Sequence, residues 1–600
     1  MNKIDAYLIF EFGLLEERLK GEAEVAETTS TNTIRLDMLV RVEDPSWNPQ
    51  NIQDYEETFR LGQSVGCIGS RHTIKALQED PAVIYVEASR PGSGWECSFP
   101  DPQSNQQVSS SVPLSVPIKA DQVHQFEKGD KALIGIIDSG IDVLHDAFLD
   151  PSGSETRILT IWDQTDETNS NLNQTNSFCP FGREYTKEEI DKYIEAQAIP
   201  PTFKDERNRH GTHVASIAAG RSGEHFLGGI APEAKIVVVK IDPQHPRGVP
   251  FTHGYALQYI EHIANKVGMP VVVNVSQGIN AGSHDGQSNL ECLYNNDFLR
   301  SGKRPGYAVV KSAGNQRNTE RHAKFNVTLK SSFTLILNCG ESVREEEFIE
   351  LWFDSGHRLE FRIENPSHET TSWVTQTNKL ECKTFSTNNV CLMDYKQLAP
   401  NGDSVLKVAI KKASANSIEG GFWKLAVRKA SGIAEQDDIH AWIEVGTTRT
   451  AYFKNSDECV TLTIPGTAEN VVVVGSVQNI SDDFPLHEIS SWGPTRRGGR
   501  KPDLVAPGVG IYAACSGTDN EICQTSGTSM AAPHVTGAIA LLFSAIENQL
   551  TEPVEQLNAS QICSAIRRTT QDFYGNWDKG RGCGVLDVSK LFEHFGLIGE

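Results

Sequence analysis

Apolar and polar positions alternate near the N-terminus, where every second side chain over residues 34–42 is apolar. This period of two predicts a strand with one buried face. A short helix over 73–79, stopped by the pair Asp80-Pro81, and a second strand over 82–86 are expected to follow. We interpret residues 1–95 as a small α/β module.

From residue 132 onward the apolar residues come in unbroken runs. Runs of this kind are buried on both faces, which is typical of parallel strands, and here they alternate with stretches of helical periodicity. The runs are 132–137, 236–241, 271–275 and 471–474, and the clearest helices are expected over 256–266 and 531–547. The alternation predicts an α/β fold in which helices cover both faces of a parallel sheet.

Between about residues 325 and 450 the pattern changes to short strands separated by Gly, Asn and Ser turns, as in antiparallel β-sandwiches. Strands are expected over 359–363, 405–410, 422–427 and 439–445. Because parallel-type runs resume afterwards, we interpret this segment as a β domain inserted into the α/β domain. The predicted organisation is the N-terminal module 1–95, a Pro/Gly/Ser-rich linker 96–115, the α/β domain in two parts, 116–318 and 458–600, and the insert 319–457.

The composition excludes several classes of protein. The 600 residues carry 55 Lys and Arg against 78 Asp and Glu, a formal net charge of −23, and 38% of them are hydrophobic. Such values are ordinary for a folded globular chain, and the acidic balance argues against binding to nucleic acid or to an anionic membrane. No window approaches the roughly 18 uninterrupted apolar residues of a membrane span.

The first residues do not follow the pattern of a secretory signal, because acidic side chains interrupt their short apolar run. We therefore expect a cytoplasmic protein, with non-classical export and a spore location as alternatives left open. The twelve cysteines include no CxxC pair. We interpret them as mostly buried thiols, neither zinc ligands nor a disulfide scaffold.

Three residues in distant segments have the side chains that nucleophilic catalysis requires. Asp138 ends a buried strand, His210 stands at the start of a helix, and Ser529 precedes another helix after a run of small residues. A nucleophilic serine needs a base within hydrogen-bond reach, and that base needs an acceptor that fixes its tautomer. Catalytic residues of open α/β sheets gather at the carboxyl ends of the strands.

Each of these residues also has a plain structural interpretation. Asp138 could be a turn residue and Ser529 a helix N-cap. His210 and His213 lie three positions apart and could suggest a metal site, but no HExxH motif occurs in the chain. His534 is interpreted as a packing residue of a core helix. The joint pattern favours the catalytic interpretation over the separate ones.

The sequence around these residues resembles the catalytic blocks of subtilisin-like serine proteases (peptidase family S8). Asp, His and Ser follow one another in the order of that family. The matching blocks are IIDSGID at 136–142, HGTHVASIAA at 210–219, VKSAGN at 310–315, SSWGP at 490–494, TSGTSMAAPHVTG at 525–537 and GCGVLD at 582–587. The resemblance covers roughly 110–318 and 458–590, and it implies a subtilisin-like parallel sheet with helices on both faces.

The resemblance also implies a role for each matching residue. Ser529 is expected to be the nucleophile, His210 the general base, and Asp138 the carboxylate that orients the imidazole. The side-chain amide of Asn315 and the backbone N–H of Ser529 are expected to bind the oxyanion. The residues expected to contact substrate are Ser276, Gln277 and Gly278 on one wall, Ser312, Ala313 and Gly314 on the other, and Gly248 and Phe251 on a second edge that would pair with an extended peptide.

The calcium site of the family does not transfer, because Ala147 occupies the usual position of an aspartate ligand. We therefore expect neither a structural metal nor any other cofactor. The long spacings between the catalytic blocks, one of them filled by the β insert, resemble the Csp-type subtilases, whose protease domain is interrupted by a jelly-roll domain. By the same resemblance, the N-terminal module is expected to be a propeptide that occupies the cleft, with a self-cleavage point between 90 and 108.

The expected function is that of a serine endopeptidase made as an autoprocessed zymogen, which hydrolyses peptide or protein substrates through an acyl-enzyme on Ser529. Two alternatives remain open. One is an inactive or self-inhibited binding protein on the same scaffold, and the other is a transpeptidase or macrocyclase in which an amine replaces water. A phosphate-binding role lacks the GxxxxGK[ST] motif.

Overall fold

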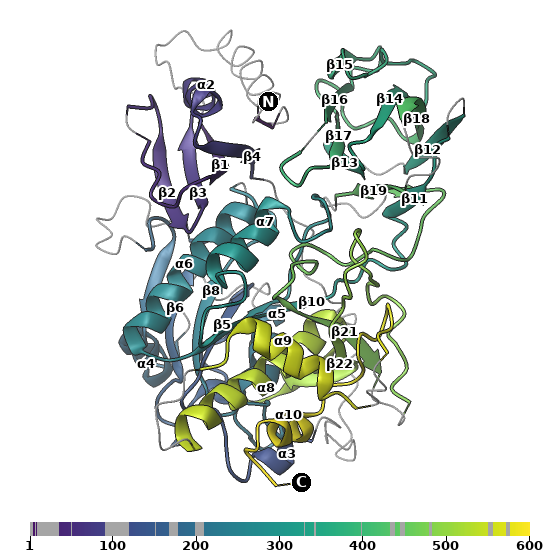
Figure 1. The fold of residues 1–600 in the computed structure, drawn as a ribbon. Helices are drawn as coiled ribbons and strands as arrows, with labels where there is room; N and C mark the ends of the chain where they lie inside the picture. Colours follow the sequence, from purple (N-terminus) through teal and green to yellow (C-terminus); the bar gives the residue numbers. More distant parts are fainter. Residues whose placement is uncertain are drawn as a thin grey trace.

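The computed structural model describes most of the chain (Figure 1). The described residues are 4, 5, 8, 35–49, 51–89, 119–150, 152–166, 178–198, 209–245, 247–328, 331–340, 344–397, 399–432, 438–444, 451–478, 483–549, 556–571 and 576–599. The whole predicted linker 96–115 lies outside these residues, and so does the predicted cleavage region from residue 90 to 108.

An eight-stranded sheet forms the centre of the α/β domain, with the strand order β22-β21-β10-β9-β5-β8-β6-β7. Neighbouring strands are parallel except for the antiparallel edge pair β6 and β7. The strands are β5 (Leu133–Asp138), β6 (Ile158–Asp163), β7 (Arg183–Thr186), β8 (Lys235–Lys240), β9 (Val271–Val275), β10 (Tyr307–Ser312), β21 (Val472–Gln478) and β22 (Leu504–Val509). The unbroken apolar runs thus form parallel strands, as predicted.

Helices cover both faces of this sheet because both faces of its strands are apolar. Along β5, Ile134 and Ile136 face one apolar core and Leu133 and Ile137 face the other. The first core holds η1 (Asp146–Phe148), α3 (Ala120–Val123), α4 (Lys187–Glu195), α5 (Arg209–Ala219), α8 (Thr528–Gln549), α9 (Ala559–Arg568) and α10 (Val588–His594). The second holds α6 (Val249–Val267), α7 (Asn289–Cys292) and η5 (Leu293–Phe298). The predicted α/β class, a parallel sheet with helices on both faces, is confirmed.

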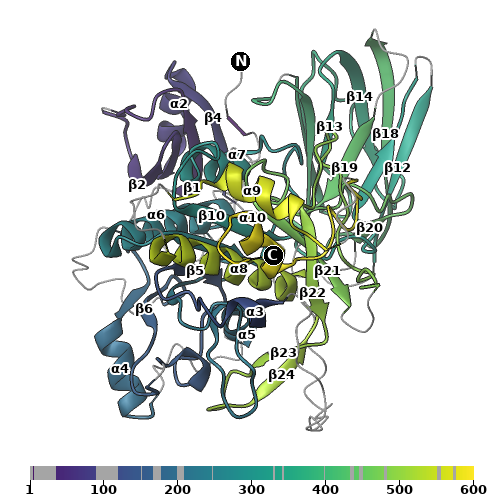
Figure 2. The same cartoon turned by 60° about the horizontal axis from the view of Figure 1, so that its bottom comes forward.

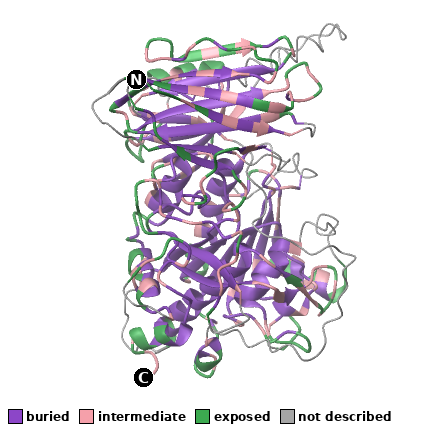
Figure 3. Cartoon of the chain, turned by 90° about the vertical axis from the view of Figure 1, so that its right-hand side faces the viewer, coloured by how far each residue is buried: buried purple, intermediate pink, exposed green. Residues whose placement is uncertain are grey.

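One helix in the described part of the chain, α8, is long and apolar enough to cross a membrane by length and composition. Every residue of its apolar window is buried inside the fold. Figure 3 shows that buried positions run through the central sheet and its helices and also through the strands of the insert. The apolar surface of α8 is therefore used in the core of the α/β domain.

The described residues of the N-terminal module form a four-stranded antiparallel sheet, with the order β2-β3-β1-β4, and one helix of at least two turns. Its elements are β1 (Leu36–Val42), β2 (Glu56–Leu61), β3 (Ser64–Gly69), α2 (Arg71–Glu79) and β4 (Val83–Ala88). Ser70 caps α2 by accepting a hydrogen bond from the N–H of His72 at 3.2 Å. The predicted strands and helix are confirmed, whereas β2 and β3, which lack a clean alternation, were not predicted.

The insert consists of two antiparallel sheets that face each other across a shared apolar core. One sheet has the order β11-β19-β13-β17-β16-β15 and the other β14-β18-β12-β20. The strands are β11 (His322–Phe325), β12 (Ser332–Cys339), β13 (Glu346–Phe353), β14 (His357–Glu364), β15 (Leu380–Thr384), β16 (Val390–Lys396), β17 (Ser404–Lys411), β18 (Gly421–Gly432), β19 (Ile439–Ile443) and β20 (Ala451–Phe453). The expected inserted antiparallel β domain is present, and its assignment as a jelly roll stays a prediction.

The N-terminal module lies beside the insert, above the α/β domain in Figure 1. Its apolar core continues into the insert through Phe348, Leu392 and Ala409. At the start of the chain, Ile4 and Leu8 are buried in the same core. The N-terminal module and the insert, which are far apart in sequence, therefore share one packed junction.

Candidate active site

The predicted site residues lie where neighbouring parallel strands end. Asp138 is the last residue of β5, Ser276 follows the last residue of β9, and Ser312 ends β10. These three strands are adjacent in the sheet. The carboxyl ends of parallel strands share one edge, which is where ligands of open α/β sheets bind.

Asp138 and His210 form a buried, hydrogen-bonded pair. The distance from His210 Nδ1 to Asp138 Oδ1 is 2.6 Å, and both side chains are at most 1% exposed. Asp138 Oδ1 also accepts a hydrogen bond from the N–H of Ser139 at 2.7 Å. With Nδ1 donating to the carboxylate, Nε2 is the ring nitrogen that is left to accept a proton.

The start of α5 fits closely against the turn after β5, and this contact holds His210 in place. A Cβ atom on Gly211 would lie 2.0 Å from the carbonyl oxygen of Gly140, so only glycine fits there. The Gly211 N–H donates to Ser139 Oγ at 2.9 Å, and the hydroxyl of Thr212 accepts from the N–H of Asp142 at 2.9 Å. The turn and the helix are thus joined by two hydrogen bonds directly after His210.

Ser529 lies in the first turn of α8 and is fully buried. Its Oγ donates a hydrogen bond to the carbonyl oxygen of Ser276 at 3.2 Å, and Ser276 Oγ donates in turn to the carbonyl oxygen of Ser529 at 3.4 Å. Helices α5 and α8, which carry His210 and Ser529, pack against each other. Attack on a substrate would require the Ser529 hydroxyl to turn from Ser276 toward the imidazole.

Asn315 lies beside the start of α8. Its Oδ1 accepts hydrogen bonds from the N–H of Thr528 at 3.2 Å and from the Thr528 hydroxyl at 3.0 Å. Because these bonds occupy the carbonyl end of the Asn315 side chain, its amide N–H groups are directed away from Thr528. First-turn N–H groups of a helix lack an intrahelical acceptor, so α8 offers the backbone N–H of Ser529 at the same place.

The loop that carries Asn315 is held by a neighbouring segment. Gly314 has a φ of +101°, and a Cβ there would meet Thr463 and Ser491 within 2.9 Å. The carbonyl oxygen of Gly314 accepts from the N–H of Ser491 at 2.9 Å, and Ser491 Oγ accepts from the N–H of Gln316 at 2.9 Å. The segment around Ser491 therefore orients the asparagine that precedes Gln316.

On the first predicted wall, Gln277 belongs to a buried polar chain. Gln277 Oε1 lies 3.0 Å from His253 Nε2, and His253 Nδ1 lies 2.7 Å from the Tyr294 hydroxyl. Burial lowers the pKa of His253 to about 4 and raises the pKa of Tyr294 well above its usual value. Both rings are therefore neutral at pH 7, with Tyr294 donating to His253 and His253 donating to Gln277. Gly278, next to Gln277, is buried as well.

On the second predicted wall, Ser312 is joined to a buried lysine. Lys311 Nζ donates to the carbonyl oxygen of Ser312 at 2.5 Å, to Ser312 Oγ at 3.1 Å and to Thr463 Oγ1 at 3.0 Å. Ala313 is fixed by main-chain hydrogen bonds, donating to Val474 at 2.9 Å and accepting from Thr463 at 3.1 Å. Both walls are thus rigid, and the contact of their residues with substrate stays a prediction.

The prediction of an extended edge at Gly248 to Phe251 is wrong, because these residues begin a helix. Gly248 is the N-cap of α6, and Val249 to Phe251 form its first turn. Pro250 explains the difference, since proline is favoured at the first positions of a helix. Phe251 is fully buried and packs against Phe59 of the N-terminal module, with ring centroids 5.7 Å apart.

The other histidines of the catalytic blocks are packing residues. His213 Nε2 lies 3.1 Å and 3.0 Å from the carbonyl oxygens of Ile511 and Cys523, and burial lowers its pKa to about 4. His534 Nδ1 lies 2.8 Å from the carbonyl oxygen of Met530. In the described ranges, no group of three or more His, Cys, Asp or Glu is placed to hold a metal ion.

Sequence reasoning missed three residues that hold this site together. Ser139 and Ser491 accept hydrogen bonds from the N–H groups that directly follow His210 and Asn315, and Thr528 donates to Asn315 itself. All three stand inside the matching blocks, so position within a block is the available signal. Together these contacts make a site that can hold an imidazole, a hydroxyl and several N–H donors in one place, which suits acyl transfer.

Comparison with known proteins relates this arrangement to a family. The model of the subtilase family, peptidase S8, matches residues 129–350 and 382–584. The C5a peptidase of Streptococcus pyogenes serotype M3 is 21% identical over 499 residues, which are 77% of this chain and 39% of that protein. The chain therefore spans well under half the length of this relative. Cerevisin of Saccharomyces cerevisiae is 32% identical over 138 residues, which are 23% of this chain and 19% of cerevisin.

Among solved structures, the CspB protease of Clostridium perfringens is similar to this chain with a TM-score of 0.68 and 24% sequence identity. The superposition covers 80% of this chain and 96% of that protein. This likeness shows a shared fold.

Proposed function

The chain belongs to the subtilase family of serine proteases, and from this premise we propose that it is a serine endopeptidase synthesised as a self-processing precursor. The observation that carries the proposal is the buried Asp138–His210 pair at 2.6 Å, at the strand edge that also receives the start of α8 with Ser529. Asn315, beside that helix start, completes the set of groups needed for acyl transfer.

In the proposed reaction, Ser529 Oγ attacks the carbonyl carbon of the scissile bond while His210 Nε2 takes its proton. Asp138 keeps Nδ1 protonated and stabilises the imidazolium that forms. The oxyanion accepts hydrogen bonds from the Ser529 N–H and the Asn315 amide. His210 then donates its proton to the leaving amine, and water, activated by the same imidazole, hydrolyses the acyl-enzyme.

The position of the N-terminal module supports its role as a propeptide. The last strand of the module, β4, ends at Ala88, and the next residue, Ser89, accepts a hydrogen bond on Oγ from the N–H of Phe251 at 3.1 Å. An ion pair between Asp37 and Arg247 at 3.0 Å lies near this contact. The chain thus leaves the module at the start of α6, on the side where substrate is expected.

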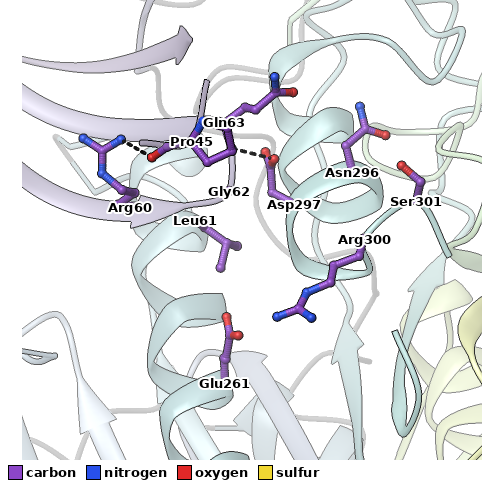
Figure 4. Close-up of a pocket in the computed structure, with 10 residues that line it drawn as sticks. All are labelled: Pro45, Arg60, Leu61, Gly62, Gln63, Glu261, Asn296, Asp297, Arg300 and Ser301. Atoms are coloured by element: carbon purple, nitrogen blue, oxygen red, sulfur yellow. Dashed lines mark hydrogen bonds between the residues drawn. The ribbon is translucent and has the colours of Figure 1, made fainter. Parts of the chain in front are cut away.

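The seam between the module and the α/β domain is partly open. A pocket of about 560 Å³ lies between the β2–β3 hairpin and the helices α6 and η5 (Figure 4). The hairpin is held there by Asp297, which accepts from Ser64 Oγ at 2.6 Å and from the N–H of Gln63 at 2.9 Å. Leu39, Phe59 and Leu61 of the module pack into the apolar core that contains α6, so the module is docked on the α/β domain through apolar as well as polar contacts.

The burial of the site also favours a second candidate function, a self-inhibited binding protein. Asp138, His210 and Ser529 are all at most 1% exposed, so the chain in this form is closed to a protein substrate. A precursor that opens after cleavage and a permanently shut scaffold both agree with this burial. Reaction with a small electrophile separates them, because a precursor whose site opens must react with it.

The experiment compares the purified wild-type chain with Ser529→Ala and Ser526→Ala. Ser526 is the matched control because it is a nearby serine whose Oγ accepts from the N–H of Gly510 at 2.9 Å. Intact-mass and N-terminal determination are expected to show a cut in wild type and Ser526→Ala and an uncut Ser529→Ala chain. A fluorophosphonate is expected to label wild type and Ser526→Ala, on Ser529 alone.

An identical cut in all three proteins would show that another protease makes it. A wild-type chain that is neither cut nor labelled would support the self-inhibited binding protein instead.

A further inference from the structure

A hairpin directly before α8 carries two cysteines on one face. It is formed by β23 (Ile511–Ala514) and β24 (Ile522–Thr525), and Figure 2 shows it at the lower edge of the molecule. Ala513 pairs with Cys523, and the N–H of Cys515 donates to the carbonyl oxygen of Glu521 at 2.9 Å, which extends the ladder by one pair. Residues opposite each other in an antiparallel pair share a face, so Cys515 and Cys523 are diagonal neighbours on one face.

Both thiols are free and half-buried, and they lie on the same face of the hairpin. A hydrogen bond between them lowers the pKa of Cys515 and raises the pKa of Cys523, and the charge of Arg209 favours the thiolate of both. A partly exposed thiol with a lowered pKa beside a second thiol is the arrangement that oxidants attack first.

The hairpin connects both halves of the proposed catalytic centre. The carbonyl oxygen of Cys523 lies 3.0 Å from Nε2 of His213, one helical turn after His210. The N–H of Gly517, in the hairpin turn, donates to Asp142 Oδ2 at 2.6 Å, in the loop that follows Asp138. In the other direction, β24 runs within four residues into Ser529.

We propose that Cys515 and Cys523 are an oxidative modification site, which a hydroperoxide converts to a reversible disulfide that slows the reaction of Ser529. The Cys515 thiolate attacks the peroxide oxygen, forming a sulfenic acid and releasing water after protonation of the leaving hydroxide. The Cys523 thiol then attacks the Cys515 sulfur, and a second water leaves. Two thiols and one hydrogen peroxide thus give one disulfide and two waters, with sulfur oxidised and peroxide reduced.

A disulfide brings the two sulfur atoms to about 2.05 Å and limits the separation of the Cα atoms to roughly 4.4–6.8 Å. Closing the diagonal pair to this geometry shifts β24 along β23. Because β24 leads into the start of α8 and contacts α5, the shift changes the relation of Ser529 to His210. The slowing of Ser529 rests on the proposed function, whereas formation of the disulfide does not.

The test treats the full-length chain with hydrogen peroxide, blocks the remaining thiols, and maps its peptides by mass spectrometry. A linked pair of peptides containing Cys515 and Cys523, lost on reduction with dithiothreitol, is expected in wild type. It is also expected in Cys382→Ser, the control for an exposed cysteine. It is expected to be absent from Cys515→Ser and Cys523→Ser. Separate oxidation of the two sulfurs to sulfinic acids, with no linked peptide, overturns the proposal.

Labelling by a fluorophosphonate tests the effect on Ser529 separately. The expected result is a labelling rate at least ten-fold lower in the oxidised wild type, restored by dithiothreitol, and no change on oxidation of Cys515→Ser. An unchanged rate in a chain that carries the mapped disulfide overturns the proposed slowing. Absence of labelling in reduced and oxidised chains alike counts against the protease function and leaves the mapped disulfide as an independent result.

Discussion

The proposed catalytic centre and the junction between the N-terminal module and the insert both bury charged side chains, but they arrange them differently. In the catalytic centre, Asp138 ends β5 and His210 begins α5, and this strand and helix pack against each other within one domain. In the junction, Asp5 and Lys407 lie 402 positions apart in the chain and come from different domains. The first pair is set by the local fold, and the second exists only when separate parts dock.

The junction surrounds its cations with acceptors. Lys407 Nζ lies 3.1 Å from Asp5, 3.3 Å from Glu350 and 3.7 Å from Glu87. Nearby, Lys396 Nζ donates to the carbonyl oxygen of Ile4 at 2.6 Å. Such a network satisfies the cation fully, which is what a buried ion needs to persist away from water.

The catalytic centre, in contrast, contains a buried hydrogen-bond acceptor that no described residue uses. Asp138 Oδ2 is buried and has no hydrogen-bond partner among the described residues. Incomplete pairing is unfavourable for stability but useful in a reaction, because charge that develops in the transition state meets groups that are already oriented. One set of buried charges is thus arranged to react and the other to hold domains together.

The largest effect is expected at the catalytic pair. Asp138→Asn is expected to lower kcat by about 10⁴-fold, because an amide favours the wrong imidazole tautomer and does not stabilise the imidazolium. Because the same groups are proposed to cut the precursor, the first-order rate of self-cleavage, followed by intact mass, measures this loss. Asp121→Asn, on an exposed position of α3, is the control and should leave the rate unchanged. A loss below ten-fold in Asp138→Asn would contradict the assigned role of Asp138.

The second effect is expected at the junction. Lys407→Ala leaves Asp5 and Glu350 buried without their cation and is expected to weaken docking of the N-terminal module by about 3–5 kcal/mol. Hydrogen exchange of β1 and β4, measured in the uncut Ser529→Ala background, reports this loss. The control is Lys412→Ala, whose partner Glu345 is mostly exposed, and which should cost at most about 1 kcal/mol. Equal losses in both variants would show that the buried network does not hold the module.

The smallest effect concerns pH at the contact between the insert and the α/β domain. Burial lowers the pKa of His284 to about 4, whereas an unfolded histidine titrates near 6.5. The unfolded chain therefore binds more protons between these values. The stability that neutral His284 contributes is complete above about pH 6.5 and is lost as the pH falls toward 4. At pH 5.5 the loss is about 1 kcal/mol.

Urea unfolding at pH 7.5 and pH 5.5, in the Ser529→Ala background, measures this dependence. His284→Asn retains a side chain that tolerates the positive φ of this position. The variant is expected to lose about 1 kcal/mol of the difference in unfolding free energy between the two pH values. A variant with the full wild-type difference would exclude His284 as one of the titrating groups.

Regular elements with a strong local pattern could be predicted from the sequence. The unbroken runs at 132–137 and 271–275 became β5 and β9, because strands buried on both faces need apolar residues at every position. The start of α6 was missed because residues 248–251 were interpreted as an extended edge, although Pro250 suits the first turn of a helix. The strands β2 and β3 were missed because residues 56–61 and 64–69 do not alternate cleanly.

Local patterns along the chain specify which side chains are available for the chemistry: a carboxylate at the end of a buried strand, and an imidazole and a hydroxyl at helix starts. These follow from rules that act within a few residues. Long-range packing sets the remaining contacts: Asn315 turns its Oδ1 toward Thr528, Ser529 donates to Ser276, and Asp5 meets Lys407. These contacts join residues more than 200 positions apart, and a hydrogen bond depends on distances of tenths of an ångström, which no local pattern specifies.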